Sequence, residues 1–255
     1  MGLHTEKDQK RYLTIMGDGK IHERVDEDVE GAKERTKKEQ DGTVSNVLDK
    51  DGNQIYELTY PGITAKIKKI QLKEGDYGAN INIDLVDEDD NQFVLSLKVD
   101  SQYGERFLEA LPNLDLNKEV EFKGYSFKPK GKDQKIRGLN ILQDEEKVLS
   151  AFATKDEDSE EWEVLIKGYP MPDPKKKYTS EKWKIFFGQR REWVLDYLLE
   201  AEMILPADAV AEDEAEDADA EDDSEEETEE TTAPAKKATA KKAPVKKGGK
   251  DDDDF

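Results

Sequence analysis

Alternating apolar residues and an uneven composition predict a mainly β fold followed by a tail that does not fold. Several short segments place apolar side chains at every second position, which is the period of a half-buried strand. The chain has 255 residues, of which 35% are hydrophobic and 40% are charged. Because globular chains are roughly 45–50% apolar, part of this chain is expected to stay unfolded.

The N-terminal region is predicted to form two hairpins. Their strands are expected at residues 12–16, 20–25, 44–48 and 54–59. The first hairpin turns at Gly17-Asp18-Gly19, where glycine supplies the positive φ angle that tight turns require. The polar residues 26–42, between the two hairpins, are expected to form a short helix or a loop.

The middle of the chain, residues 54–143, is predicted to be the folded core. Its alternating segments predict strands, in chain order, at 63–72, 80–85, 93–99, 120–127 and 136–142. Residues 101–111 have the apolar spacing of a helix, with Ser101 as its N-cap and Pro112 behind it. Three strands, a helix and two strands are the order of an OB-fold, a five-stranded barrel. An OB-fold binds its ligand on strands 2 and 3 and on the loops between strands 1–2 and 4–5.

Residues 144–206 are predicted to elaborate this core, so that residues 1–206 form one folded domain. Further strands are expected at 162–166 and 183–187. Between them, the proline-rich arm at 168–177 cannot join the centre of a sheet. Residues 188–205 carry an apolar stripe opposite a charged one, which predicts an amphipathic helix that Pro206 ends. The helix is expected to pack on the domain, and a partner-binding surface is the alternative.

The remaining residues, 207–255, hold 19 acidic and 7 basic residues. Their net charge of −12 is more than half of the −22 of the whole chain. Their like charges repel one another and few side chains are large enough to bury, so this acidic tail is predicted to be disordered. An Ala/Asp/Glu tract is followed by a Pro/Ala/Lys tract. The chain then ends in Asp251, Asp252, Asp253, Asp254 and Phe255.

Three segments of the predicted domain are locally basic although the pI of the chain is 4.6. They are residues 64–73, 118–142 and 167–191, and each contains or borders aromatic residues. Lysines neutralise phosphates, and unpaired bases stack on exposed rings, which contributes about 1–3 kcal/mol per base. This pattern is typical of a protein that binds single-stranded nucleic acid. The alternative is structural, with strand aromatics in the core and lysines on the opposite side.

The candidate DNA-binding residues come from these segments and from the end of the third core strand. They are Lys66, Lys68, Tyr77, Lys98, Lys123, Tyr125, Phe127, Lys128, Lys130, Lys132, Lys135, Arg137, Lys175, Lys176, Lys177, Tyr178 and Trp183. The lysine-rich loop between the fourth and fifth core strands falls where an OB-fold places its ligand.

Residue types that most catalytic and metal sites require are missing or scattered. The chain has no Cys, which excludes disulfides, zinc–thiolate sites, iron–sulfur clusters and thiol nucleophiles. His4 and His22 have no partner at metal or triad spacing, and no P-loop or serine-nucleophile motif is present. The sequence therefore predicts a protein that is not an enzyme, with no catalytic residue, cofactor or metal. It has neither a signal peptide nor an apolar run of about 18 residues, so a soluble protein is expected.

Two parts of the sequence together carry a family resemblance. One is the final Asp-Asp-Asp-Asp-Phe. The other is the predicted core, with Gly62-Ile-Thr-Ala-Lys-Ile, Ile81-Asn-Ile-Asp-Leu-Val-Asp and Gly138-Leu-Asn-Ile-Leu-Gln. In these parts the chain resembles the phage-type single-stranded DNA-binding proteins, which have an OB-fold core and an acidic C-terminal tail ending in Phe. The Pro/Ala/Lys tract is not part of that pattern. It is interpreted as a second weak DNA contact, as a partner of the acidic tract, or as a spacer.

The resemblance implies a protein that binds and protects single-stranded DNA without sequence specificity during phage DNA replication, recombination or repair. It implies that residues 251–255 recruit replication and recombination proteins of the polymerase, helicase or primase class. It also implies that the tail covers the basic groove when DNA is absent. A monomer or homodimer in the host cytoplasm, without membrane contact, is expected. Two alternatives stay open: an acidic protein-interaction module (a DNA mimic or assembly chaperone) that binds no DNA, and a barrel that reads RNA.

Overall fold

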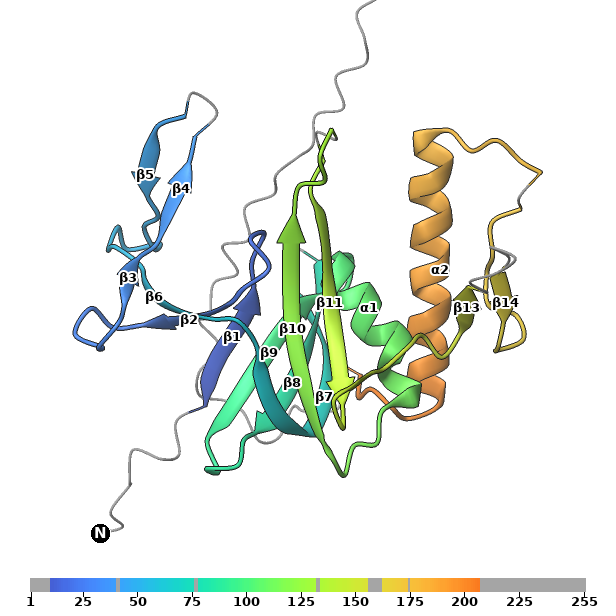
Figure 1. Cartoon of the computed structure of the whole chain (residues 1–255), viewed down its shortest axis with the longest axis horizontal. Coiled ribbons are helices and arrows are strands. Elements are labelled where there is room, and N and C mark those ends of the chain that lie inside the picture. The colour runs from blue at the N-terminus through green and yellow to red at the C-terminus, as the bar shows by residue number, and fades with distance from the viewer. Residues whose placement is uncertain are drawn as a thin grey trace, which may run out of the picture. The chain divides into compact units, whose positions relative to one another are not determined.

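The computed structural model describes residues 10–39, 42–75, 78–131, 134–155, 162–173 and 175–206 (Figure 1). Within these residues the fold is mainly β, as predicted, with one large sheet, two small sheets and two α-helices. The acidic tail at 207–255, with the residues predicted to dock partners, lies outside the described residues, as do Tyr77 and Lys132. None of the described helices is long and apolar enough to cross a membrane.

Among the described residues, the large sheet has 10 strands in the order β12-β11-β10-β7-β8-β9-β1-β2-β6-β3. They are β1 (Arg11–Ile15), β2 (Ile21–Val25), β3 (Lys33–Glu34), β6 (Tyr56–Tyr60), β7 (Ile63–Gly75), β8 (Gly78–Val86), β9 (Gln92–Lys98), β10 (Glu119–Phe127), β11 (Ile136–Gln143) and β12 (Glu146–Lys147). The small sheets pair β4 (Thr36–Lys38) with β5 (Val44–Asn46) and β13 (Ala153–Lys155) with β14 (Trp162–Val164). Neighbouring strands are antiparallel, except that β1 and β9 are parallel.

The predicted core strands and the helix between them are present in the predicted order. β7, β8 and β9 are successive antiparallel neighbours, and β10 pairs with both β7 and β11. α1 (Gln102–Ala110) follows β9, and its N-cap Ser101 accepts a hydrogen bond from the Gly104 N–H at 3.0 Å. Within the described residues no ladder of hydrogen bonds joins β9 to β11. The sheet is therefore open where the prediction has a closed barrel.

The β1–β2 hairpin occupies the edge of β9 and turns back onto β10. β1 pairs with β9, so that Arg11 lies opposite Phe93. The turn rests so closely on β10 that a Cβ atom on Gly19 would overlap the backbone of Tyr125. Gly19 also has a φ angle of +82°, so both its space and its backbone conformation require glycine. The first predicted hairpin is confirmed, and it contacts two core strands.

The second predicted hairpin has different partners in the structure. β5 pairs with β4, whereas β6 pairs with β2 and β3. The predicted turn between β5 and β6 is present, because the Gly52 N–H donates to the Asp49 carbonyl at 3.0 Å. The pairing of β6 with β2 is stabilised by Tyr60, whose hydroxyl donates to the buried Glu23 carboxylate at 2.7 Å. The polar segment before this turn contains β3 and β4, and its described residues form no helix.

The prediction for residues 183–187 is wrong, because they are helical. They belong to α2 (Ser180–Glu200), whose N-cap Thr179 accepts a hydrogen bond from the Lys182 N–H at 3.3 Å. The aromatic residues of this segment recur three and four residues apart, which is the period of a helix. Gly188 continues the helix, which therefore begins eight residues before the predicted start at this glycine.

The C-terminal elaboration shares one hydrophobic core with the large sheet. Val194 and Leu198 of α2 are buried in that core, which confirms that the helix packs on the domain. The backbone after α2 joins β7, because Leu205 donates to the Ile70 carbonyl and accepts from the Leu72 N–H, both at 2.9 Å. β14 is the predicted strand in this region, although shorter, and the described residues of the proline-rich arm form neither helix nor strand.

Candidate nucleic-acid interface

The β10–β11 hairpin presents two aromatic rings and an isoleucine on the side that faces away from the core. Tyr125 lies opposite Gly138, and Phe127 lies opposite Ile136. Phe127 is 53% exposed, Ile136 is 40% exposed, and the centroids of the two rings are 6.2 Å apart. Strand alternation places this set on the side opposite the fully buried Phe122. We call Tyr125, Phe127 and Ile136 the hairpin face.

Gly138 allows the Tyr125 ring to lie against β11. A Cβ atom at position 138 would overlap the phenol ring of Tyr125, so no other residue fits there without moving the ring. The Tyr125 ring therefore packs on the backbone of Gly138, its cross-strand neighbour, which has no side chain.

Lysines border the hairpin face, in agreement with the sequence pattern. Lys123, Lys128, Lys130 and Lys135 are exposed on the two strands or on the loop between them. Lys123 lies two residues before Tyr125 on the same side of β10, and its ammonium is 2.5 Å from the Glu121 carboxylate. The structural alternative, in which strand aromatics fill the core, does not hold for Phe127.

The predicted lysines of β7 are not brought to the hairpin face. Lys66 and Lys68 are exposed on β7, and Lys66 lies opposite Glu119, at the other end of β10 from Phe127. A strand rises about 3.3 Å per residue, so these two ends of β10 are about 26 Å apart. Lys98 is half-buried at the end of β9. Lys66 and Lys68 are therefore separate from the aromatic part of the candidate site, whereas Lys98 lies just before α1.

A groove of about 220 Å³ lies between the β10–β11 hairpin, α1 and α2. It is lined by Gln102, Glu105, Arg106, Glu109, Tyr125, Arg137, Gly138, Leu139, Lys147 and Arg190. Tyr125 connects this groove to the hairpin face. We call it the arginine groove, because three of its basic side chains are arginines contributed by three different elements.

Backbone carbonyls orient two of these arginines. Arg106 donates to the Val148 carbonyl, and Arg137 donates to the Gly17 carbonyl at 3.2 Å. A carbonyl carries no net charge, so the contact with Val148 fixes the Arg106 guanidinium without neutralising it. Such an oriented guanidinium matches the geometry of a phosphate group.

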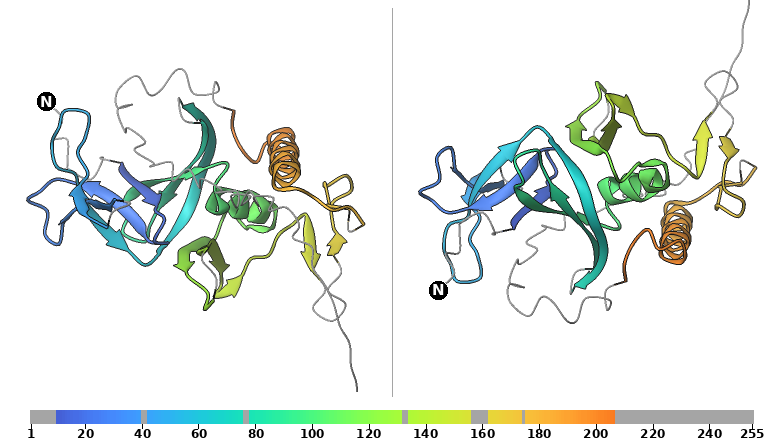
Figure 2. Two further views of the ribbon diagram at one scale, coloured as in Figure 1. Left: turned by 90° about the horizontal axis from the view of Figure 1, so that it is seen from above. Right: turned by 90° about the horizontal axis from the view of Figure 1, so that it is seen from below.

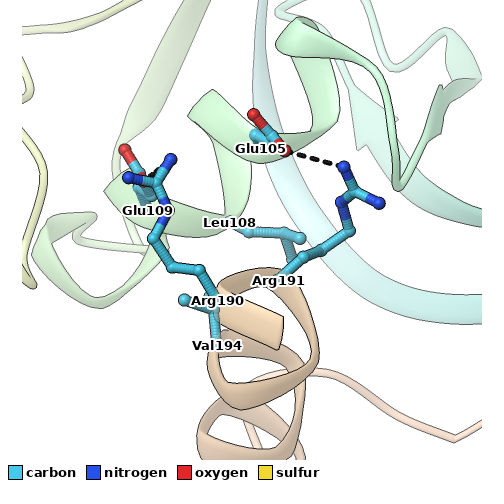
Figure 3. Close-up of a pocket in the computed structure, with 6 residues that line it drawn as sticks. All are labelled: Glu105, Leu108, Glu109, Arg190, Arg191 and Val194. Carbon is cyan, nitrogen blue, oxygen red and sulfur yellow. Dashed lines mark hydrogen bonds and ion pairs between the residues drawn. The ribbon is translucent and has the colours of Figure 1, made fainter. Parts of the chain in front are cut away.

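The carboxylates of the arginine groove are engaged by arginines of α2. Arg191 donates to Glu105 at 2.8 Å, and Arg190 lies 3.5 Å from Glu109 (Figure 3). Tyr169 also donates to Glu109, at 2.9 Å, and burial together with this carboxylate raises the pKa of Tyr169 well above its ordinary value. The pocket drawn in Figure 3 holds about 10 Å³, which is no more than one water molecule needs. This pocket is part of the packing contact between α1 and α2 and not a ligand site.

The remaining predicted residues lie on the other side of α1. Figures 1 and 2 show α1 between the β10–β11 hairpin and α2. Lys175, Lys176 and Lys177 are exposed on the proline-rich arm. Tyr178 stacks on Trp183 where this arm enters α2, with ring centroids 4.5 Å apart. The arginine groove thus lies between these residues and the hairpin face.

Sequence reasoning missed three basic residues of the arginine groove: Arg106, Lys147 and Arg190. Arg106 lies beside the apolar stripe of α1, a position where an arginine usually faces solvent without a specific role. Its neighbours come from β11 and α2, which contact α1 only in the folded chain. Arg190 has a local signal, because it lies in a basic segment and at helical spacing from the aromatic residues before it.

Comparison with known proteins gives no relative on which to base an assignment. No family model, no curated protein and no solved structure matches the chain. Within the part of the chain that the structure describes, no group of three or more His, Asp or Glu residues is placed to hold a metal ion. The candidate site consists of the hairpin face, its bordering lysines and the arginine groove.

Proposed function

We propose that this protein binds and protects single-stranded DNA without sequence specificity during phage DNA replication, recombination or repair. The observation that carries the proposal is the hairpin face, where Phe127 is 53% exposed beside Tyr125 and is bordered by lysines. Exposed rings gain about 1–3 kcal/mol for each base that stacks on them, and lysines neutralise the phosphates. A duplex hides the faces of its bases, so ring stacking favours single strands.

The strand order supports a variant of the OB-fold as the scaffold for this activity. β7, β8, β9, α1, β10 and β11 follow each other as the elements of an OB-fold do. In this proposal the β1–β2 hairpin, which contacts both β9 and β10, completes the barrel. The loop between β10 and β11 is then the ligand loop between strands 4 and 5, and it borders the hairpin face.

We assign the acidic tail a docking and regulatory role, and the protein a binding role without catalysis, in the host cytoplasm. A terminal Phe255 enters a small apolar pocket on a polymerase, helicase or primase, and basic residues around that pocket bind the aspartates and the terminal carboxylate. The carboxylates of residues 207–255 compete with phosphates for the lysines of the domain. The support for this role is the charge and the ending of the sequence.

Oligonucleotide binding at two salt concentrations tests the proposed function. Fluorescence anisotropy of the full chain would compare single-stranded DNA, RNA of the same sequence and duplex DNA, each tens of bases long. We expect single-stranded DNA to bind most tightly. We also expect its affinity to fall steeply as salt rises, because bound lysines release counterions from the phosphates.

Three results would overturn the proposal. Equal or tighter binding of duplex DNA would contradict a site built on base stacking. Tighter binding of the matched RNA would assign the hairpin face to RNA. Absence of binding, both by the full chain and by a chain without residues 207–255, would favour the acidic protein-interaction module.

A further inference from the structure

α2 continues beyond the part of the core that it covers. Val194 and Leu198 are its buried residues, and both lie in its C-terminal half. The same stripe nevertheless extends toward the N-terminus through Arg190, Phe187 and Trp183, which are three and four residues apart. In Figure 1 the N-terminal end of α2 reaches past α1, toward the same side as the end of β10.

Three aromatic rings form a ladder along this extension. The ring centroids of Tyr178 and Trp183 are 4.5 Å apart, and those of Trp183 and Phe187 are 5.3 Å apart. The Arg190 guanidinium lies 5.0 Å from the Phe187 centroid and continues the series. Phe187 is 37% exposed, and its neighbour Ile185 is 61% exposed. We call Tyr178, Trp183 and Phe187 the ring ladder.

The charges of α2 are unevenly distributed along the helix. As far as Arg191, α2 carries Lys182, Lys184, Arg190 and Arg191 with Glu181, and after Arg191 it carries Glu192, Asp196 and Glu200. The helix dipole acts on the first and last turns, where Glu181 is favourable while Lys182 and Glu200 are not. Positive charge beside rings stands out in a chain with a net charge of −22.

Arg190 connects the ring ladder to the arginine groove. Its guanidinium lies over the Phe187 ring, and the same side chain lines the groove with Arg106 and Arg137. Tyr125 lines the groove as well and belongs to the hairpin face. Neighbouring side chains therefore span the whole distance between the hairpin face and the ring ladder.

We propose that a single DNA strand bound on the hairpin face continues through the arginine groove and ends on the ring ladder. This inference rests on the proposed function and adds a second base-binding surface to it. Phosphates pass over the groove, and bases pack against the ladder between Lys182 and Lys184, which flank Trp183 on the helix surface. A guanidinium has five N–H donors, so Arg190 binds a phosphate while it keeps its contact with Glu109.

The charge of the surface identifies a nucleic acid as its occupant. A second copy of this chain, docked by two-fold symmetry, would bring the same lysines and arginines against themselves. Such like-charge contacts oppose association. The phosphates of a single strand instead complement these side chains, and its bases complement the rings.

Affinity measured against oligonucleotide length tests the inference. The variants are Trp183→Ala and the double variant Lys182→Ala/Lys184→Ala, both in the full chain. We expect unchanged affinity for the shortest oligonucleotides that bind. For strands of tens of bases, Trp183→Ala should lose roughly fivefold to a hundredfold, because the ladder loses the middle ring that holds Tyr178 and Phe187 in place for the bases. Trp183→Phe should retain most of the affinity, because a ring remains.

A matched control separates the ladder from general charge effects. Lys33→Ala/Lys38→Ala removes the same charge from exposed positions on β3 and β4. Equal losses in the two double variants would overturn the inference. Unchanged affinity of Trp183→Ala for oligonucleotides of every length would also overturn the inference. If Phe127→Ala then lost affinity at every length, the proposed function would still hold.

Two further measurements complete the test. Thermal unfolding followed by circular dichroism checks that Trp183→Ala keeps its fold, and Lys182→Ala/Lys184→Ala supplies the same test without removing a ring. Sedimentation velocity measures self-association. Loss of self-association in the Trp183→Ala variant, with DNA affinity unchanged, would assign the ring ladder to a second copy of the chain and overturn the inference.

Discussion

At the scale of single residues, Phe127 gives the sharpest test of the hairpin face. Phe127→Ala should weaken binding to single-stranded DNA by roughly fivefold to a hundredfold, because one base stack is lost. The side chain is 53% exposed and pairs with Ile136 across the hairpin, so the free energy of unfolding should fall by no more than about 1 kcal/mol. Anisotropy and urea unfolding measure the two effects. Leu149→Ala, which truncates a side chain that is 58% exposed elsewhere, is the control. Equal affinities of Phe127→Ala and the parent chain would contradict the assignment.

His22 on β2 predicts a pH dependence of stability, because its ring lies between two carboxylates. Nε2 is 3.1 Å from Asp18, and Nδ1 is 3.0 Å from Glu57. Burial alone lowers the pKa of His22, but the two carboxylates outweigh burial and raise this pKa above its ordinary value. Protonation of His22 therefore stabilises the fold. This contribution is complete below the unfolded pKa of about 6.5 and is lost as pH rises through the folded pKa.

The substitution His22→Gln should cost more stability in acid than in base. We expect a larger loss in the free energy of unfolding at about pH 5.5 than at about pH 8.5, because only the protonated ring is attracted to both carboxylates. Urea unfolding of the two chains at both pH values measures the difference. A loss that is the same at both values would mean that the ion pairs of His22 add no stability.

At the scale of elements, glycines on β10 and α2 predict opposite effects of alanine. A Cβ atom on Gly124 would overlap the Gly19 carbonyl, so Gly124→Ala should push the β1–β2 turn off β10. A destabilisation of about 1–3 kcal/mol is typical of an overpacked site. The Cβ position of Gly188 has no atom within 4 Å. Gly188→Ala should therefore stabilise the chain by about 0.5–1 kcal/mol, through helix propensity alone. Urea unfolding measures both changes, and equal signs would contradict this account.

The elements predicted correctly are those whose local pattern agrees with their packing. β8 alternates in sequence because Ile81, Ile83 and Leu85 are buried while the residues between them are not. Residues 183–187 are ambiguous, since a cluster of aromatic residues within one helical turn also resembles a buried strand. The N-cap Thr179 and the stacking of Tyr178 on Trp183 favour the helix over the strand. Neither contact can be detected from the alternation of apolar residues.

Strand partners were harder to predict than strands. The second N-terminal hairpin is predicted because its two segments flank a turn, and the turn is present. Its strands nevertheless pair elsewhere, since β6 adds to β2 where Tyr60 reaches Glu23. Such a choice depends on a buried carboxylate and its donors, which are distant in sequence.

At the scale of the whole molecule, the acidic tail makes the clearest prediction. Residues 207–255 hold 19 acidic and 7 basic residues. Their removal should tighten binding to single-stranded DNA, because a competing polyanion is gone. Anisotropy at low salt measures this change. Unchanged or weaker binding would argue against competition by the tail. Deletion of Phe255 alone is the matched variant and should spare DNA binding while it abolishes capture of replication proteins.

The candidate site could be predicted in part. Tyr125 and Phe127 follow from the alternation of β10 and from the lysines around them. Arg106 and Arg190 do not, because they become neighbours of Tyr125 only when α1 packs against β11 and α2. Lys66 shows the converse: it is basic and exposed, yet the register of β10 places it far from the rings.

The parallel pairing of β1 with β9 has a consequence for folding kinetics. Arg11 lies opposite Phe93, so one edge of the first strand has no partner until the core meander has formed. Leu205 likewise reaches β7 only after α2 is complete. Long loops must close before these contacts repay the lost entropy, and domains rich in such contacts fold in about milliseconds to seconds. On the ribosome, the N-terminal hairpin must therefore wait for residues synthesised much later before it can dock.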